Sequence, residues 1–151
     1  MERIASFCVD HTKLNPGIYV SRIDDDITTF DLRFKRPNHP PFISCGAMHS
    51  LEHLFATIAR NSEHKEKIIY FGPMGCQTGF YFLVRSMSNE TAISLIKDII
   101  SKISEWEGEI PGISEEECGN YLLHDLDDAK KEAAEFLKAI KNWDVKDTKY
   151  K

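Results

Sequence analysis

The sequence predicts an α+β fold in which a mostly antiparallel sheet packs against helices in two layers. Apolar and polar residues alternate in the first part of the chain, which indicates strands, whereas later segments repeat apolar residues every three or four positions, which indicates helices. No β-α-β repeat is evident, and this disfavours a doubly wound parallel sheet. The length of 151 residues suits one domain, residues 1–151.

Two strands are predicted first, at residues 18–20 and 30–34, because their apolar side chains recur at every second position. The three aspartates at 24–26 form the turn between them. The prolines within 37–41 then enforce an irregular loop, since proline fixes φ and lacks the backbone N–H. This pattern indicates two neighbouring antiparallel strands.

A second pair of strands is predicted at residues 68–71 and 80–84, both expected to be buried. The turn that joins them, 72–79, is rich in the glycines that tight turns need. Helical spacing of apolar residues predicts three helices, at about residues 47–61, 90–106 and 125–142.

Composition narrows the class of protein. The chain has 19 Lys and Arg against 24 Asp and Glu, a net charge of −5, which argues against nucleic acid as a partner. No stretch approaches the roughly 20 apolar residues of a membrane span, and the first residues do not resemble a signal peptide. We therefore expect a cytoplasmic protein with no membrane partner, whose four cysteines stay reduced.

The most informative motif is His49-Ser50-Leu51-Glu52-His53, within the first predicted helix. Residues four apart lie on one face of a helix, so both imidazoles can reach one ion. Two neutral imidazoles suit zinc, iron(II) or cobalt(II). Because the helix is largely apolar, burying these side chains without a partner would be costly. The motif therefore predicts a metal site, with the Glu52 carboxylate pointing into the same cavity.

Two cysteines can add chemistry to this site. Catalytic metals usually have three protein ligands. Cys118, in a turn after an acidic run, is the best candidate for the third ligand. The alternative is that Cys118 is a small buried residue with a structural role only. Cys76 lies in the glycine-rich turn. A thiol near a metal ion and backbone N–H groups can act as an acid or base, although chance placement in a turn is common.

The segments HSLEHL (49–54), GPMGCQTGFY (72–81) and ECGNY (117–121), with FDLRF at 30–34, resemble S-ribosylhomocysteine lyases. These enzymes make the precursor of the signal autoinducer-2. The resemblance covers nearly the whole chain, and its motifs are specific. It implies a small α+β homodimer with two active sites at the subunit interface. It also implies one divalent ion per subunit, iron(II) in the native enzyme and replaceable by zinc or cobalt.

The resemblance assigns roles residue by residue. The ion is held at the positions of His49, His53 and Cys118, and Glu52 and Cys76 match the two general acid/base residues. Positions that contact the substrate match three further residues, the first two of which are expected to reach across the dimer: Ser6, His11 and Arg33. One departure is visible, because some members carry an aspartate where this chain has Tyr70.

The implied reaction moves the sugar carbonyl from C1 to C2 and then to C3 through enediolates. Sulfur is then lost by β-elimination, which gives homocysteine and 4,5-dihydroxy-2,3-pentanedione. A Lewis-acid ion stabilises the developing charge, and acid/base groups on either side of the sugar shuttle protons. The sequence thus predicts a carbon–sulfur lyase.

Two rival functions are weighed against this one. His-x-x-Glu-His is also the inverzincin pattern, so a metallopeptidase with a distant glutamate ligand is an alternative, although the chain is short for a substrate cleft. A zinc-stabilised binding module would instead use Cys76 as a fourth ligand in a closed Cys2His2 site. From the residues alone, Arg33 is expected to form a solvent-exposed ion pair, and the following histidines receive no role: His39, His64 and His124.

Overall fold

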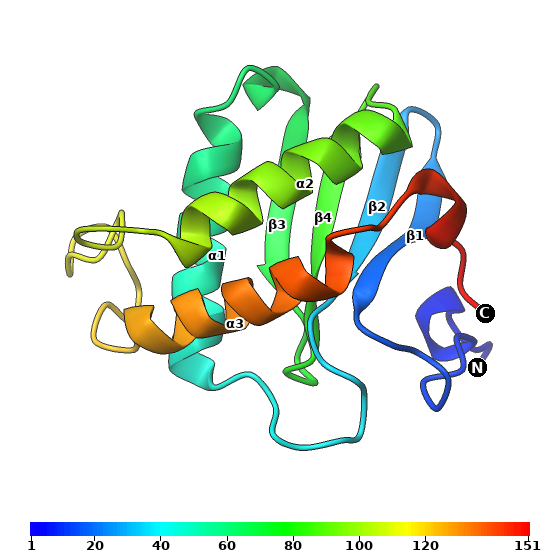
Figure 1. The fold of residues 1–151 in the computed structure, drawn as a ribbon, viewed down its shortest axis with the longest axis horizontal. Coiled ribbons are helices and arrows are strands. Elements are labelled where there is room, and N and C mark those ends of the chain that lie inside the picture. The colour runs from blue at the N-terminus through cyan, green and yellow to red at the C-terminus, as the bar shows by residue number, and fades with distance from the viewer.

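The computed structural model describes residues 1–151 and places four strands in one antiparallel sheet (Figure 1). The strands are β1 (Gly17–Asp24), β2 (Ile27–Arg33), β3 (Ile68–Pro73) and β4 (Gly79–Arg85). Their order across the sheet is β1-β2-β4-β3, and each neighbouring pair is antiparallel. Consecutive strands therefore pair as two hairpins, which join through β2 and β4.

Three helices, α1 (Cys45–Arg60), α2 (Asn89–Ser104) and α3 (Leu126–Ile140), cover one face of this sheet (Figure 1). The α+β, two-layer, antiparallel prediction is confirmed. Short 3-10 turns occupy Ala5–Phe7, Lys65–Lys67 and Val145–Asp147. No helix combines the length and the apolar composition that a bilayer crossing requires.

Side-chain caps set the start of each helix. Ser44, Ser88 and Asp125 each accept a hydrogen bond from a backbone N–H of the first turn, which satisfies a donor that has no partner within the helix. The cap at Ser44 explains why α1 begins two residues earlier than the apolar spacing indicates. The first of the two added residues is Cys45, which is exposed at the helix start.

The core lies between the helices and the inner face of the sheet. Phe30 and Leu32 of β2 and Phe80 and Phe82 of β4 point toward the helices and are fully buried. Phe136 of α3 reaches this layer and stacks on Phe34 with ring centroids 4.0 Å apart. These aromatic contacts fix how α3 lies on the sheet. The position of α3 in turn fixes where the preceding loop, residues 105–125, ends.

The outer face of the sheet carries polar residues that are nevertheless covered. Asp31 and Arg33 alternate with the core residues of β2, yet Arg33 is only 3% exposed. Tyr150, from the chain end that lies beside β1 (Figure 1), donates to Asp31 Oδ2 and stacks on Tyr19. The residue-based prediction of a solvent-exposed ion pair for Arg33 is therefore wrong, because both chain ends fold over this part of the sheet.

Phe136→Ala is expected to lower the free energy of unfolding by about 3–5 kcal/mol, because it removes a stacked ring and leaves a cavity between α3 and the sheet. Urea denaturation followed by circular dichroism measures the change. The exposed Lys138→Ala on the same helix is the control and is expected to change stability by less than about 0.5 kcal/mol. Equal effects of the two variants would contradict the packing described.

Candidate metal centre

Helix α1 places His49 and His53 one turn apart on one face, with ring centroids 4.7 Å apart. Leu51, Leu54 and Phe55 occupy the opposite side and are buried in the core. The apolar face thus orients α1, and the orientation of α1 turns both imidazoles toward the loop between α2 and α3. The predicted pairing of the two histidines is confirmed in this geometry.

Backbone carbonyls of that loop fix the protonation of both rings. Nδ1 of His49 donates to Leu123 O at 2.6 Å, and Nδ1 of His53 donates to Pro111 O at 2.9 Å. A carbonyl oxygen only accepts, so each Nδ1 carries the ring hydrogen and each Nε2 keeps its lone pair. Both lone pairs face the same space. This is the tautomer that a metal-binding imidazole requires.

Cys118 completes the group from the same loop. Its sulfur lies 3.4 Å from Nε2 of His49 and 3.8 Å from Nε2 of His53. A tetrahedral ion with ordinary Zn–S and Zn–N bonds separates sulfur from nitrogen by about 3.5 Å. The sulfur is held in place because the Cys118 N–H donates to Ser114 O at 3.0 Å and Ser114 Oγ donates to Glu117. These donors fit a divalent ion.

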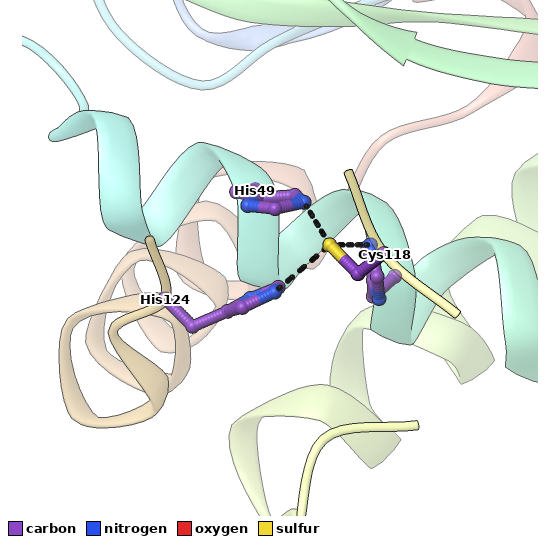
Figure 2. A group of neighbouring side chains, drawn as sticks. His49, Cys118 and His124 are labelled. Carbon is purple, nitrogen blue, oxygen red and sulfur yellow. Dashed lines mark hydrogen bonds between the residues drawn. The ribbon is translucent and has the colours of Figure 1, made fainter. Parts of the chain in front are cut away.

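The structure brings a fourth donor to the group, His124. Its Nε2 lies 3.9 Å from the Cys118 sulfur, and its ring stacks on His49 with centroids 3.9 Å apart. The donor atoms of His49, His53, Cys118 and His124 all lie within 4.8 Å of one another (Figure 2). No role was predicted for His124, but the structure places it beside the other three donors. The sequence offered one signal for His124, its position directly before Asp125, the residue that caps α3. A cap fixes where the helix begins, and so also where the residue before it lies.

Burial, together with the charges that the neighbouring His49 and His53 can carry, lowers the pKa of His124 to about 4. At neutral pH the His124 imidazole is accordingly uncharged. An uncharged ring can approach a bound cation or a second imidazole without electrostatic repulsion. The four side chains of His49, His53, Cys118 and His124 can therefore surround a cation.

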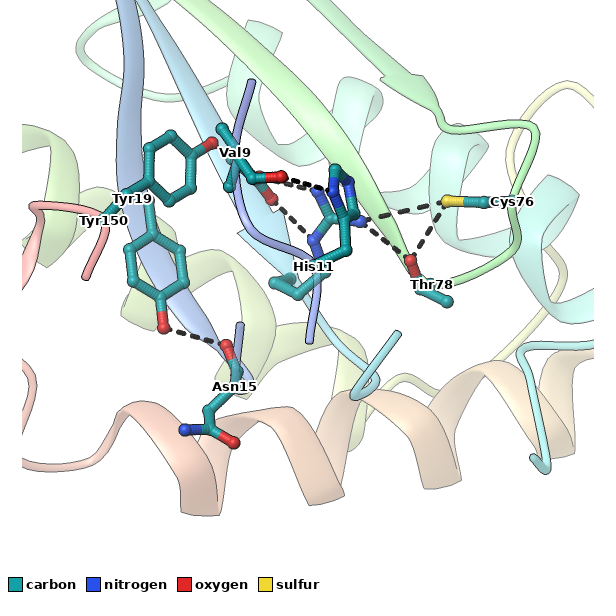
Figure 3. Close-up of polar contacts among 9 residues, drawn as sticks. Val9, His11, Asn15, Tyr19, Cys76, Thr78 and Tyr150 are labelled. Carbon is teal, nitrogen blue, oxygen red and sulfur yellow. Dashed lines mark hydrogen bonds and ion pairs between the residues drawn. The ribbon is translucent and has the colours of Figure 1, made fainter. Parts of the chain in front are cut away.

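Cys76 lies apart from these four donors. Its sulfur contacts Thr78 Oγ1 at 3.0 Å and Arg33 Nη1 at 3.8 Å (Figure 3). Within one chain Cys76 is not among the donors that lie together, so a single chain does not form the closed Cys2His2 site of a zinc module. Cys76 instead has a cation, Arg33, and a hydroxyl, that of Thr78, as neighbours.

Two pockets meet at the loop that joins β3 and β4. The first, about 480 Å³, contains His49 and Glu52 from α1, and we call it the helix-side pocket. The second, about 370 Å³, contains Ser6, His11, Arg33 and Cys76, and we call it the sheet-side pocket. The two pockets share only three residues, the last of β3 and the first two of the loop that follows it: Pro73, Met74 and Gly75. Within one chain, Glu52 and Cys76 thus open into different pockets.

The sheet-side pocket is built around a buried ion pair. Arg33 donates from Nε and Nη2 to the two carboxylate oxygens of Asp31, at 3.1 and 2.7 Å, and from Nη1 to Thr78 Oγ1 at 2.8 Å. Burial by itself lowers the pKa of Arg33, but the attraction and hydrogen bonds of Asp31 outweigh it, so the pKa of Arg33 is raised. Arg33 therefore remains a cation beside Cys76.

Tyr70, where some relatives of the resembled family carry aspartate, lies on the outer face of β3 and is 54% exposed. Its ring covers Gly72 so closely that a Cβ at position 72 would collide with it. Tyr70 lines neither the helix-side nor the sheet-side pocket. The residue that departs from the family pattern is thus neither a metal donor nor part of the lining of either pocket.

Comparison with known proteins gives one consistent result. The sequence profile of the S-Ribosylhomocysteinase (LuxS) family matches residues 4–147. A protein of Borreliella afzelii named S-ribosylhomocysteine lyase is 47% identical over 156 aligned positions, which span 99% of each chain. Proteins of the same name from Phocaeicola vulgatus and Finegoldia magna are 44% and 48% identical, over 99% and 94% of this chain.

Cys118→Ser is expected to reduce bound metal from one ion per chain to nearly none, because it removes the thiolate from a site with few ligands. Elemental analysis after dialysis against a trace of chelator measures the ratio. The exposed Cys8→Ser is the matched control and should retain its metal. A fully loaded Cys118→Ser protein would favour the metallopeptidase hypothesis, in which a glutamate is the third ligand.

Proposed function

The chain belongs to the S-ribosylhomocysteinase family, and we propose that it cleaves the thioether of S-ribosylhomocysteine to homocysteine and 4,5-dihydroxy-2,3-pentanedione. The observation that carries the proposal is the convergence of His49, His53 and Cys118, with both imidazoles in the metal-binding tautomer. These three residues would hold one divalent ion, which we propose to be iron(II), with zinc or cobalt able to substitute.

When bound, the ion supplies a Lewis acid that stabilises negative charge on the sugar oxygens as the carbonyl migrates. The remaining work is proton transfer by the protein. We assign Cys76 the removal and return of protons at carbon, because its sulfur lines the sheet-side pocket and contacts Arg33 and Thr78 there. We assign Glu52, beside His49 in the helix-side pocket, the protonation of oxygens and the relay of protons.

Substrate contacts are proposed for the other residues of the sheet-side pocket. Nδ1 of His11 donates to Val9 O at 2.8 Å, so its Nε2 is free to accept from a sugar hydroxyl, and Ser6 is half-buried beside it. Arg33 already uses four of its five N–H groups on Asp31, Thr78 and Cys76. Its substrate contact would therefore use the one remaining N–H on Nη2.

We further propose that the active site forms between two copies of the chain. The resembled family implies that Ser6 and His11 reach across a homodimer, and Cys76 lines the same pocket as both. Ser6, His11 and Cys76 would then cross together to meet Glu52 and the ion of the partner. Phe7, a large apolar side chain that is exposed and lines the sheet-side pocket, supports an interface there.

Metal-loaded protein should release homocysteine from S-ribosylhomocysteine, measured by titration of the free thiol. Glu52→Gln and Cys76→Ala should each lower kcat at least about 100-fold, because each removes a group that transfers a proton. The matched controls Glu63→Gln and Cys8→Ala, both of exposed residues, should keep the wild-type rate. Retention of activity in either active-site variant would contradict the assigned roles.

A mixture of the two inactive variants tests the shared site. If Glu52 and Cys76 of one site come from different chains, a dimer of Glu52→Gln with Cys76→Ala contains one intact site. Random exchange of subunits in an equal mixture should then restore about one quarter of the wild-type activity. Activity that stays at the level of the separate variants after subunit exchange would place both residues of each site on one chain.

A further inference from the structure

His124 raises a question about the metal set, because a histidine this close to Cys118 could either bind the ion or serve the sulfur. As a fourth ligand, it would close the tetrahedral site and leave no position for a substrate oxygen. As a hydrogen-bond donor to the sulfur, it would leave that position open. The two roles need opposite tautomers, since a ligand presents the Nε2 lone pair and a donor presents an Nε2 hydrogen.

The contacts of Ser50 distinguish the two tautomers. Ser50 lies on α1 and is fully buried. Its Oγ accepts from the backbone N–H of Asp125 at 2.9 Å and lies 3.1 Å from Nδ1 of His124. Because Asp125 N–H is a donor, the only acceptor within reach of the Ser50 hydroxyl hydrogen is Nδ1 of His124. A buried hydroxyl that fails to donate is costly, so Ser50 donates to Nδ1.

This assignment places the ring hydrogen of His124 on Nε2. That nitrogen is 3.9 Å from the Cys118 sulfur and points at it, as Figure 2 shows. His49 and His53 differ, because their Nδ1 atoms face carbonyls and their Nε2 atoms therefore carry lone pairs. Three imidazoles thus surround one sulfur, but the partner of each Nδ1 divides them into two ligands and one donor.

We propose that His124, held by the buried hydroxyl of Ser50, is a positioning residue that donates its Nε2 hydrogen to the Cys118 thiolate and does not bind the ion. This inference rests on the proposed metal set of His49, His53 and Cys118. The hydrogen bond withdraws electron density from the sulfur, which makes the ion a stronger Lewis acid toward the substrate. It also keeps the fourth position of the ion free.

Cobalt(II)-loaded protein without substrate tests the proposal, because the sulfur-to-cobalt charge-transfer band reports the sulfur and the visible d–d bands report the ligand set. In His124→Phe the charge-transfer band should move to lower energy, since the sulfur loses a donor, while the d–d bands keep their positions. His124→Gln, which restores an N–H, should return the band toward wild type, and the exposed His39→Phe should leave it unchanged.

Ser50→Ala is the second variant, which leaves His124 in place and removes only the hydroxyl that sets its tautomer. It should move the charge-transfer band in the same direction as His124→Phe. Altered d–d bands in His124→Phe would show that His124 is a ligand. An unmoved charge-transfer band in His124→Phe would show that the hydrogen bond to the sulfur is absent, and an unmoved band in Ser50→Ala would show that Ser50 does not set the tautomer of His124. Each of these results overturns the proposal. None depends on turnover, so a failure of the lyase assay is a separate result.

Discussion

The site depends on the bonds between the two α1 imidazoles and the backbone carbonyls of the loop that returns to them. Leu123 O and Pro111 O lie at the two ends of that loop, and each holds one ring through Nδ1. The same bonds select the tautomer, orient the lone pairs and bring Cys118 within reach of both rings. The orientation of the two imidazoles and the position of the loop between α2 and α3 are therefore set by the same two hydrogen bonds.

In the sheet-side pocket, the ion pair of Asp31 and Arg33 fixes the position of the side chain that contacts Cys76. Asp31 and Arg33 face away from the core, yet both are buried because the chain ends fold over them. Asp31 receives hydrogen bonds from Arg33 and from Tyr150, which leaves the guanidinium oriented toward Thr78 and Cys76. Such a pair costs desolvation free energy, and in return it holds a cation in a fixed position next to the sulfur of Cys76.

The fold could be predicted from local patterns because the alternation of residues in β2 and β4 and the helical spacing in α1 each reflect one buried face. Helix starts were less accurate, since a single cap such as Ser44 moves the boundary without changing the apolar pattern. The burial of Arg33 could not be predicted, because the residues that cover it come from segments far away in the sequence.

The sequence by itself determined the fold class, the family and the pair of histidines on α1, because each follows from spacing within a short segment. Only the tertiary structure decided that His124 joins His49, His53 and Cys118, and that Glu52 and Cys76 open into different pockets. The physical reason is that hydrogen-bond partners such as Ser50 and His124, 74 positions apart, meet only when α1 packs against the start of α3.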